Sequence, residues 1–184
     1  MCIRDSLRQA RELGARLRGE RIAAVYTSPI RRAVQTAAEA AAALGLPGSV
    51  AVAGLEEFSV GAQTEQAVLD RVRVAVSDLA DRHRGEALLV VSHGGVLTLA
   101  LRRLAVNGRP GLALGRPLAH CATVRVEVDA DGLGGRHRAL HGPLVGIRVR
   151  DEGWPTGICE TVCRTAPLIR RIVLPPLGLA PDPL

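Results

Sequence analysis

Two residues of this 184-residue chain stand where a bound anion would be held, Arg32 and His93. Arg32 comes after the apolar run 22–27, near the start of an expected helix, where its guanidinium offers a two-pronged fork beside backbone N–H groups. His93 comes after the apolar run 87–91 and precedes two glycines, which let the backbone approach a ligand closely. Open α/β sheets bind ligands beyond the carboxyl ends of their strands, so we expect both side chains to face one ligand.

The elements that hold these residues follow from turn residues and apolar spacing. Ser28 is expected to cap the helix that carries Arg32, with Pro29 in its first position, and Gly45 ends that helix after Leu44. Thr64 is expected to cap a second helix. The apolar stripe of that second helix is predicted to consist of Val68, Val72, Ala75, Val76 and Leu79.

Strands alternate with helices along most of the chain, which predicts an α/β fold, a three-layer α/β/α sandwich with a mostly parallel sheet. The run 87–91 is apolar throughout, as is typical of a strand buried on both faces. The expected strands are 22–27, 50–53, 87–91 and 121–128, and the expected helices begin near residues 7, 29, 64 and 96.

The composition favours one domain with a core of Ala, Val and Leu, since 47% of residues are hydrophobic and only 2% aromatic. The net charge is +6, and every basic residue is an arginine. These arginines lie among acidic residues rather than in one stripe, so a solvated surface is favoured over a nucleic-acid-binding face. No apolar run approaches the length that crosses a bilayer, and the charged first residues argue against a signal peptide, so a cytoplasmic location is expected.

The cysteines give no metal site. They are Cys2, Cys121, Cys159 and Cys163, and only the last two have a spacing that could place them on one helical face. No second pair and no nearby histidine completes a zinc set, so ordinary reduced cysteines are favoured.

The segments Thr27–Ala37 and Val90–Gly95 resemble the histidine phosphatase superfamily, also called the phosphoglycerate mutase-like family. Arg32 matches the arginine of the family pattern Ser-Pro-x-x-Arg-Ala-x-x-Thr-Ala, and His93 matches the second family histidine. The resemblance covers about residues 7–140. It implies a reaction in which one histidine attacks phosphorus, arginines and the second histidine hold the phosphoryl oxygens, and a carboxylic acid protonates the leaving oxygen.

A third segment resembles the part of the family that carries the proton donor. Residues 55–61 fit the pattern Leu-x-Glu-x-x-x-Gly, and alignment selects Glu57, with Glu56 as the less favoured candidate and a surface loop acid as the alternative. Ser28 is expected to line the phosphate pocket in addition to capping. His120 lies where relatives often carry a polar residue, although a structural role is favoured for it.

One family feature is missing, because no Arg-His-Gly occurs in the sequence. In the family this motif ends the first strand and supplies the nucleophile, so we expect a sheet with its first strand missing, unpaired backbone groups inside that sheet, and an inactive chain. Residues 1–6 resemble a translated adapter and are interpreted as a non-native leader. The partial histidine phosphatase-like domain is then 7–140, followed by a Pro/Arg-rich tail, 141–184, for which a genuine extension, a flexible appendage and an out-of-frame translation are the alternatives.

The resemblance implies a phosphomonoester hydrolase that works through a phosphohistidine, with a phosphorylated small molecule as its partner. Glu57 and His93 are the candidate catalytic residues, and Arg32, His93 and Ser28 are the candidate phosphate-binding residues. The alternatives are mutase-type phosphoryl transfer, a non-catalytic relative that binds a phosphorylated ligand, and an arginine-rich nucleic-acid binder. No metal or organic cofactor is implied, and neither a particular substrate nor an oligomeric state is indicated.

Overall fold

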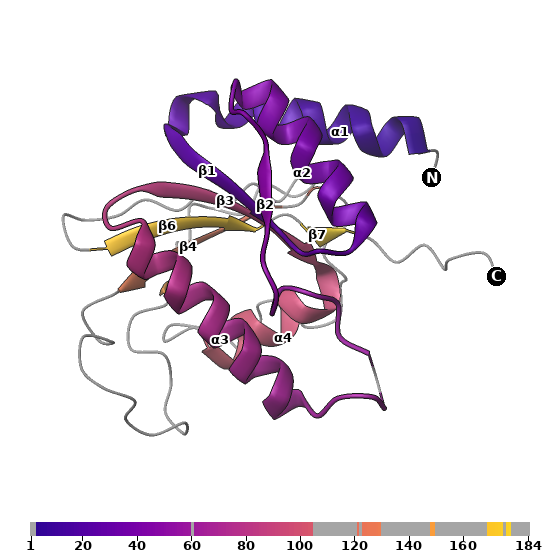
Figure 1. The fold of residues 1–184 in the computed structure, drawn as a ribbon, viewed down its shortest axis with the longest axis vertical. Coiled ribbons are helices and arrows are strands. Elements are labelled where there is room, and N and C mark those ends of the chain that lie inside the picture. Colours follow the sequence, from indigo (N-terminus) through magenta and orange to yellow (C-terminus); the bar gives the residue numbers. More distant parts are fainter. Residues whose placement is uncertain are drawn as a thin grey trace.

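The computed structural model describes residues 3–59, 61–104, 121, 123–129, 148–149, 169–174 and 176–177. Figure 1 shows helices on both sides of a central sheet. The elements are α1 (Ile3–Arg16), a 3-10 turn (Leu17–Glu20), β1 (Ile22–Thr27), α2 (Arg31–Leu44), β2 (Ser49–Ala51), α3 (Glu65–Arg82), β3 (Ala87–His93), α4 (Gly94–Leu104), β4 (Val124–Asp129), β5 (Arg148–Val149), β6 (Ile169–Leu174) and β7 (Pro176–Leu177).

The sheet is mixed but mostly parallel, in the order β2-β1-β3-β6-β4-β5. Strands β2, β1, β3 and β6 run parallel to one another, and β4 is antiparallel to both β6 and β5. Helices α1 and α2 pack on one face of the sheet, and α3 and α4 pack on the other (Figure 1). The predicted three-layer α/β/α sandwich is therefore confirmed.

Strand β3 is central, and all seven of its residues are buried. Its side chains alternate between the two faces: Leu88 and Val90 join the core beneath α3 and α4, whereas Leu89 and Val91 join the core beneath α1 and α2. This double burial explains the unbroken apolar run in the sequence. The strand extends two residues further than predicted and ends at His93, directly before α4.

The C-terminal part of the chain contributes to the sheet. The first element of the described residues is α1. The expected row of unpaired backbone groups is wrong, because β6 lies between β3 and β4 and pairs with both. Strands β5, β6 and β7 all come from the predicted tail. The predicted boundaries at residues 7 and 141 separate the domain from a non-native leader and from the tail. Strand pairing does not test this division, so both boundaries stay predictions.

Two helix ends agree with the sequence. Thr64 caps α3, since its Oγ1 accepts a hydrogen bond from the Ala67 N–H at 3.2 Å, and the predicted stripe of α3 is buried. Gly45 ends α2 with φ +76°, and its N–H reaches the carbonyls of Ala41 and Ala42. The left-handed conformation at this position favours glycine because it has no Cβ.

The start of α2 differs from the prediction. Its N-cap is Ile30, without a side-chain cap hydrogen bond, and Ser28 and Pro29 lie before the helix. The Ser28 hydroxyl instead contacts the side chain of His93. Ser28 is therefore not the N-cap residue, because the helix begins at Arg31, and the Ser28 Oγ accepts from the Ile30 N–H at 3.3 Å, before the first turn.

Among the described residues no helix is long and apolar enough to cross a membrane. The predicted cytoplasmic location stays a prediction. Four residues named in the sequence analysis lie outside the described residues, namely His120, Cys2, Cys159 and Cys163, whereas Cys121 is a buried free thiol.

The close packing of α1 on α2 depends on Gly14. A Cβ at this position would come within 2.4 Å of the Ala40 carbonyl oxygen and 2.7 Å of the Ala43 Cβ. We expect Gly14→Val to lower the free energy of unfolding by about 2 kcal/mol, because the helices must move apart. Urea denaturation measures this loss. The matched control is Gly19→Val, where a Cβ would meet nothing within 4 Å; equal losses in both variants would contradict the prediction.

Candidate functional site

The carboxyl ends of β1 and β3 bring Ser28 and His93 together. The strands are parallel neighbours, with Thr27 in register with Val91, and the Ser28 N–H donates to the Val91 carbonyl at 2.9 Å. The His93 Nε2 lies 2.8 Å from the Ser28 Oγ, and both residues are fully buried. Parallel pairing therefore holds the predicted histidine against the predicted serine at the end of the sheet where open α/β sheets bind ligands.

Burial, and after it the positive charge of Arg32, lowers the pKa of His93 from 6.5 to about 4. The imidazole is therefore neutral at pH 7. The Ser28 Oγ accepts from the Ile30 N–H at 3.3 Å, which leaves its own proton free to point at Nε2. In that arrangement the imidazole proton is on Nδ1, which is buried and has no partner among the described residues. His93 then presents one free N–H donor.

Arg32 is the second residue of α2, close enough to His93 for its charge to affect the imidazole. Its side chain is half-buried, whereas that of Arg31 is exposed, as expected for helix neighbours about 100° apart. The Arg32 Nε is buried and has no hydrogen-bond partner within the described part of the chain. A buried donor without a partner is costly, and a bound anion would satisfy it.

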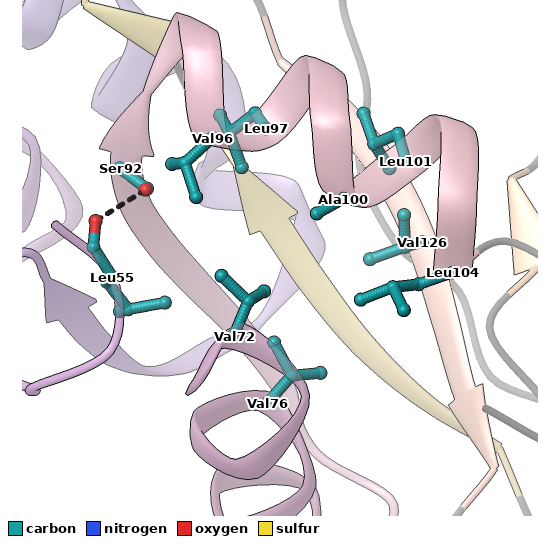
Figure 2. Close-up of a pocket in the computed structure, with 10 residues that line it drawn as sticks. All are labelled: Leu55, Val72, Val76, Ser92, Val96, Leu97, Ala100, Leu101, Leu104 and Val126. Atoms are coloured by element: carbon teal, nitrogen blue, oxygen red, sulfur yellow. Dashed lines mark hydrogen bonds between the residues drawn. The ribbon is translucent and has the colours of Figure 1, made fainter. Parts of the chain in front are cut away.

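Glu57 lies in the loop between β2 and α3 and reaches the N-terminus of α4. Its Oε1 accepts from the backbone N–H groups of Phe58 at 2.9 Å and Val96 at 3.1 Å. Its Oε2 is buried and has no partner in the regions that the structure describes. The loop is also fixed to β3, because the Ser92 hydroxyl donates to the Leu55 carbonyl at 2.8 Å (Figure 2).

Glu56 has a different environment from that of Glu57. Its Oε2 accepts from the Gly54 N–H at 2.8 Å and from Arg71 at 3.2 Å, so its charge is used within its own loop. Arg71 on α3 also donates to the carbonyls of Gly54, Glu56 and Glu57. Arg71 therefore clamps the loop that presents Glu57. The sequence gives no signal for this role, because 14 to 17 residues separate Arg71 from its partners.

The close approach of α4 to Glu57 requires Gly95. A Cβ there would lie 2.7 Å from the Glu57 Oε1. We expect Gly95→Ala to push the carboxylate away and to lower the free energy of unfolding by about 1 kcal/mol, because the hydrogen bond from Val96 is lost. Amide chemical shifts of Val96 and Phe58 report the displacement, with Gly19→Ala as control. Unchanged shifts at both amides would contradict it.

A cavity of about 30 Å³ lies between α3, α4 and the sheet (Figure 2). Its lining is almost entirely apolar, with the Ser92 hydroxyl turned to the Leu55 carbonyl, and it includes none of the four predicted site residues. It therefore offers no polar group to a charged ligand. Within the described residues, no group of three His, Cys, Asp or Glu side chains could hold a metal ion.

The fold defines a class of protein, the three-layer α/β sandwiches with a polar site at the carboxyl ends of neighbouring parallel strands. The chain belongs to the histidine phosphatase superfamily (branch 1), whose sequence profile matches residues 4–67 and 56–136, most of the chain. The resemblance noted in the sequence is thereby confirmed. Membership supports phosphatase-type chemistry, the hydrolysis or transfer of a phosphoryl group.

Solved structures with the same fold have little sequence identity to this chain. YhfR of Bacillus stearothermophilus is 23% identical, with a TM-score of 0.57 over 70% of this chain and 79% of that one. Mycobacterial glucosyl-3-phosphoglycerate phosphatase in complex with VO3 is 18% identical, with a TM-score of 0.58 over 80% of this chain and 83% of that one. Mycobacterial hydrolase 2 is 20% identical, with a TM-score of 0.58 over 80% and 76%. No curated protein matches the sequence.

Proposed function

We propose that the domain binds a phosphomonoester at the carboxyl ends of β1 and β3, as a phosphatase-type site without its nucleophile. One observation carries this proposal. The three residues that motifs select, Arg32, Glu57 and His93, each keep a buried polar atom without a partner among the described residues. Buried polar atoms are normally paired, and a bound phosphomonoester would give these three atoms partners.

The three groups divide the work of phosphoryl transfer. Arg32 and His93 donate to the phosphoryl oxygens, with Ser28 orienting the imidazole through its Oγ at 2.8 Å. Glu57 protonates the oxygen of the leaving alcohol as the P–O bond breaks. In the family a histidine nitrogen attacks phosphorus, and water later releases phosphate from that histidine.

The attacking histidine is what this chain lacks. His93 has its Nε2 against Ser28 and lies in the phosphate-binding position, and the sequence contains no Arg-His-Gly. We therefore expect binding without turnover. The second candidate function is a non-catalytic relative that binds a phosphorylated ligand, and the sequence upstream of Leu7 separates the two, because an in-frame strand ending in Arg-His-Gly would support the enzyme. Mutase-type transfer is less favoured, because mutases tend to carry longer insertions around the segment with the acid.

The test compares binding with turnover. Millimolar inorganic phosphate should raise the melting temperature of the unaltered chain, and p-nitrophenyl phosphate should be hydrolysed at a negligible rate. Sulfate and chloride at the same concentration serve as comparison ions. Absence of stabilisation by phosphate would contradict the proposed site. A fast hydrolysis that is abolished in His93→Gln would overturn the assignment of His93 to phosphate binding. Binding to DNA that falls steeply with salt would instead favour the nucleic-acid alternative.

A further inference from the structure

We propose that the end of the C-terminal segment, Pro176 and Leu177 in β7, occupies the position from which a nucleophile would attack the bound phosphoryl group. A histidine at this position would then complete the site. The inference rests on the proposed function, because it concerns the same phosphate site.

The strand register carries the argument. His93 ends the central strand β3, and two neighbouring strands flank that end in the part of the chain that the structure describes. On one side is β1, which leads into Ser28, already in contact with His93. On the other side is β7, in which Pro176 is in register with Ser92 and Leu177 with His93.

The C-terminal segment follows β3 along most of its length. Strand β6 pairs in parallel with β3 from Ala87 to Leu89, and β7 continues the pairing at Ser92 and His93 (Figure 1). On its other side β6 is held by six antiparallel pairs with β4. The segment is therefore an interior strand of the sheet, and its end reaches the same edge as Ser28 and His93.

The spacing between strands and the residue types in β7 then identify the position of the nucleophile. Neighbouring strands lie about 4.8 Å apart, so a residue in register with His93 starts within one side-chain length of whatever His93 binds. On the β1 side, the side chain of Ser28 already contacts His93. Proline and leucine carry no nucleophilic group. The position beside His93 on the β7 side is thus occupied by backbone, yet contains no group that can attack phosphorus.

The step that a histidine there would perform is balanced. Its nitrogen lone pair forms a P–N bond while the P–O bond to the alcohol breaks, and the leaving oxygen takes a proton from Glu57. Water then attacks the phosphohistidine, the P–N bond breaks, and inorganic phosphate leaves while Glu57 recovers a proton from that water.

The experiment places histidine at the two register positions in the full chain. We expect Leu177→His or Pro176→His to hydrolyse p-nitrophenyl phosphate at least about tenfold faster than the unaltered chain, and to form an acid-labile phosphohistidine. The matched control is Leu177→Asn, which is polar and of similar size but not nucleophilic. The gain should be absent from this control and should disappear when Arg32→Ala is combined with the histidine variant.

A second measurement does not depend on any variant. Amide hydrogen exchange in the unaltered chain should be slow for residues 169–174, because an interior strand is protected on both sides. Exchange as fast as in an unfolded peptide would overturn the inference. So would slow exchange and intact phosphate binding without a gain in either histidine variant. Failure of the unaltered chain to bind phosphate would instead contradict the proposed function.

Discussion

Replacing Arg32 by alanine is expected to weaken the binding of inorganic phosphate by about tenfold to hundredfold. The guanidinium donates charge-assisted hydrogen bonds, and its Nε is a buried donor that has no partner among the described residues. Isothermal titration calorimetry measures the change in dissociation constant. The loss should be largest near pH 7.5, where phosphate is mainly a dianion.

The control for this variant is Arg31→Ala. Arg31 precedes Arg32 on the same helix and carries the same charge, but its side chain is exposed. Removing it lowers the net charge from +6 to +5, as Arg32→Ala also does. At about 0.15 M salt, exposed charges are screened over roughly 8 Å, so Arg31→Ala should change binding less than about threefold. Equal losses in both variants would mean that phosphate responds to overall charge and that Arg32 holds no ligand.

The same pair of arginines shows what local patterns predict well. The expected helix places them on different faces, and one is exposed while the other is half-buried. Apolar periodicity likewise predicts the buried stripe of α3, which includes Val68 and Leu79. Each of these features depends on residues within one or two helical turns, so the sequence carries the information locally.

Contacts between distant residues were not predictable in this way. Ser28 has the residue type and position of a helix cap, but it contacts His93, 65 residues away. The His83 Nε2 likewise lies 2.6 Å from the hydroxyl of Tyr26, which is 57 residues away. Such pairs form only once the chain has folded, so no local pattern reveals them.

The C-terminal strand is the largest difference between sequence and structure. Strand β6 contains the adjacent arginines Arg170 and Arg171, whereas interior strands of a parallel sheet are typically apolar throughout. That composition, and the prolines Pro175 and Pro176 that follow β6, do not indicate a strand. The pairing with β3 and β4 gives the segment backbone partners that its own sequence does not suggest.

Lowering the pH from 7 to 4 is expected to reduce the free energy of unfolding by about 3 kcal/mol through His93 alone. Burial and the nearby Arg32 lower the pKa of His93 from 6.5 to about 4, while the charges of Glu57 and Glu56 raise it and that of Arg71 lowers it. Between these two pH values the unfolded chain binds a proton on this residue and the folded chain does not. The stabilisation is therefore complete above pH 6.5 and is lost as the pH falls towards 4.

The difference between two proteins isolates this effect, because other carboxylates and histidines titrate in the same range. Urea denaturation should be followed at intervals from pH 7 to 4 for the unaltered chain and for His93→Gln, which has no titratable group at this position. The unaltered chain should show the steeper loss, with a difference between the two proteins that changes by about 3 kcal/mol from pH 7 to 4. Parallel curves would contradict a neutral, buried His93.

Bound phosphate should weaken this dependence of the free energy of unfolding on pH, because it lies beside His93 in the proposed site. A bound dianion beside the imidazole favours the protonated form and so raises the pKa of His93 towards its ordinary value. Saturating phosphate should therefore flatten the slope between pH 6.5 and 5.5 in the unaltered chain and leave that of His93→Gln unchanged. If phosphate stabilises both proteins with no change in slope, then it binds at a place remote from His93, and the arrangement of Arg32, Ser28 and His93 is structural.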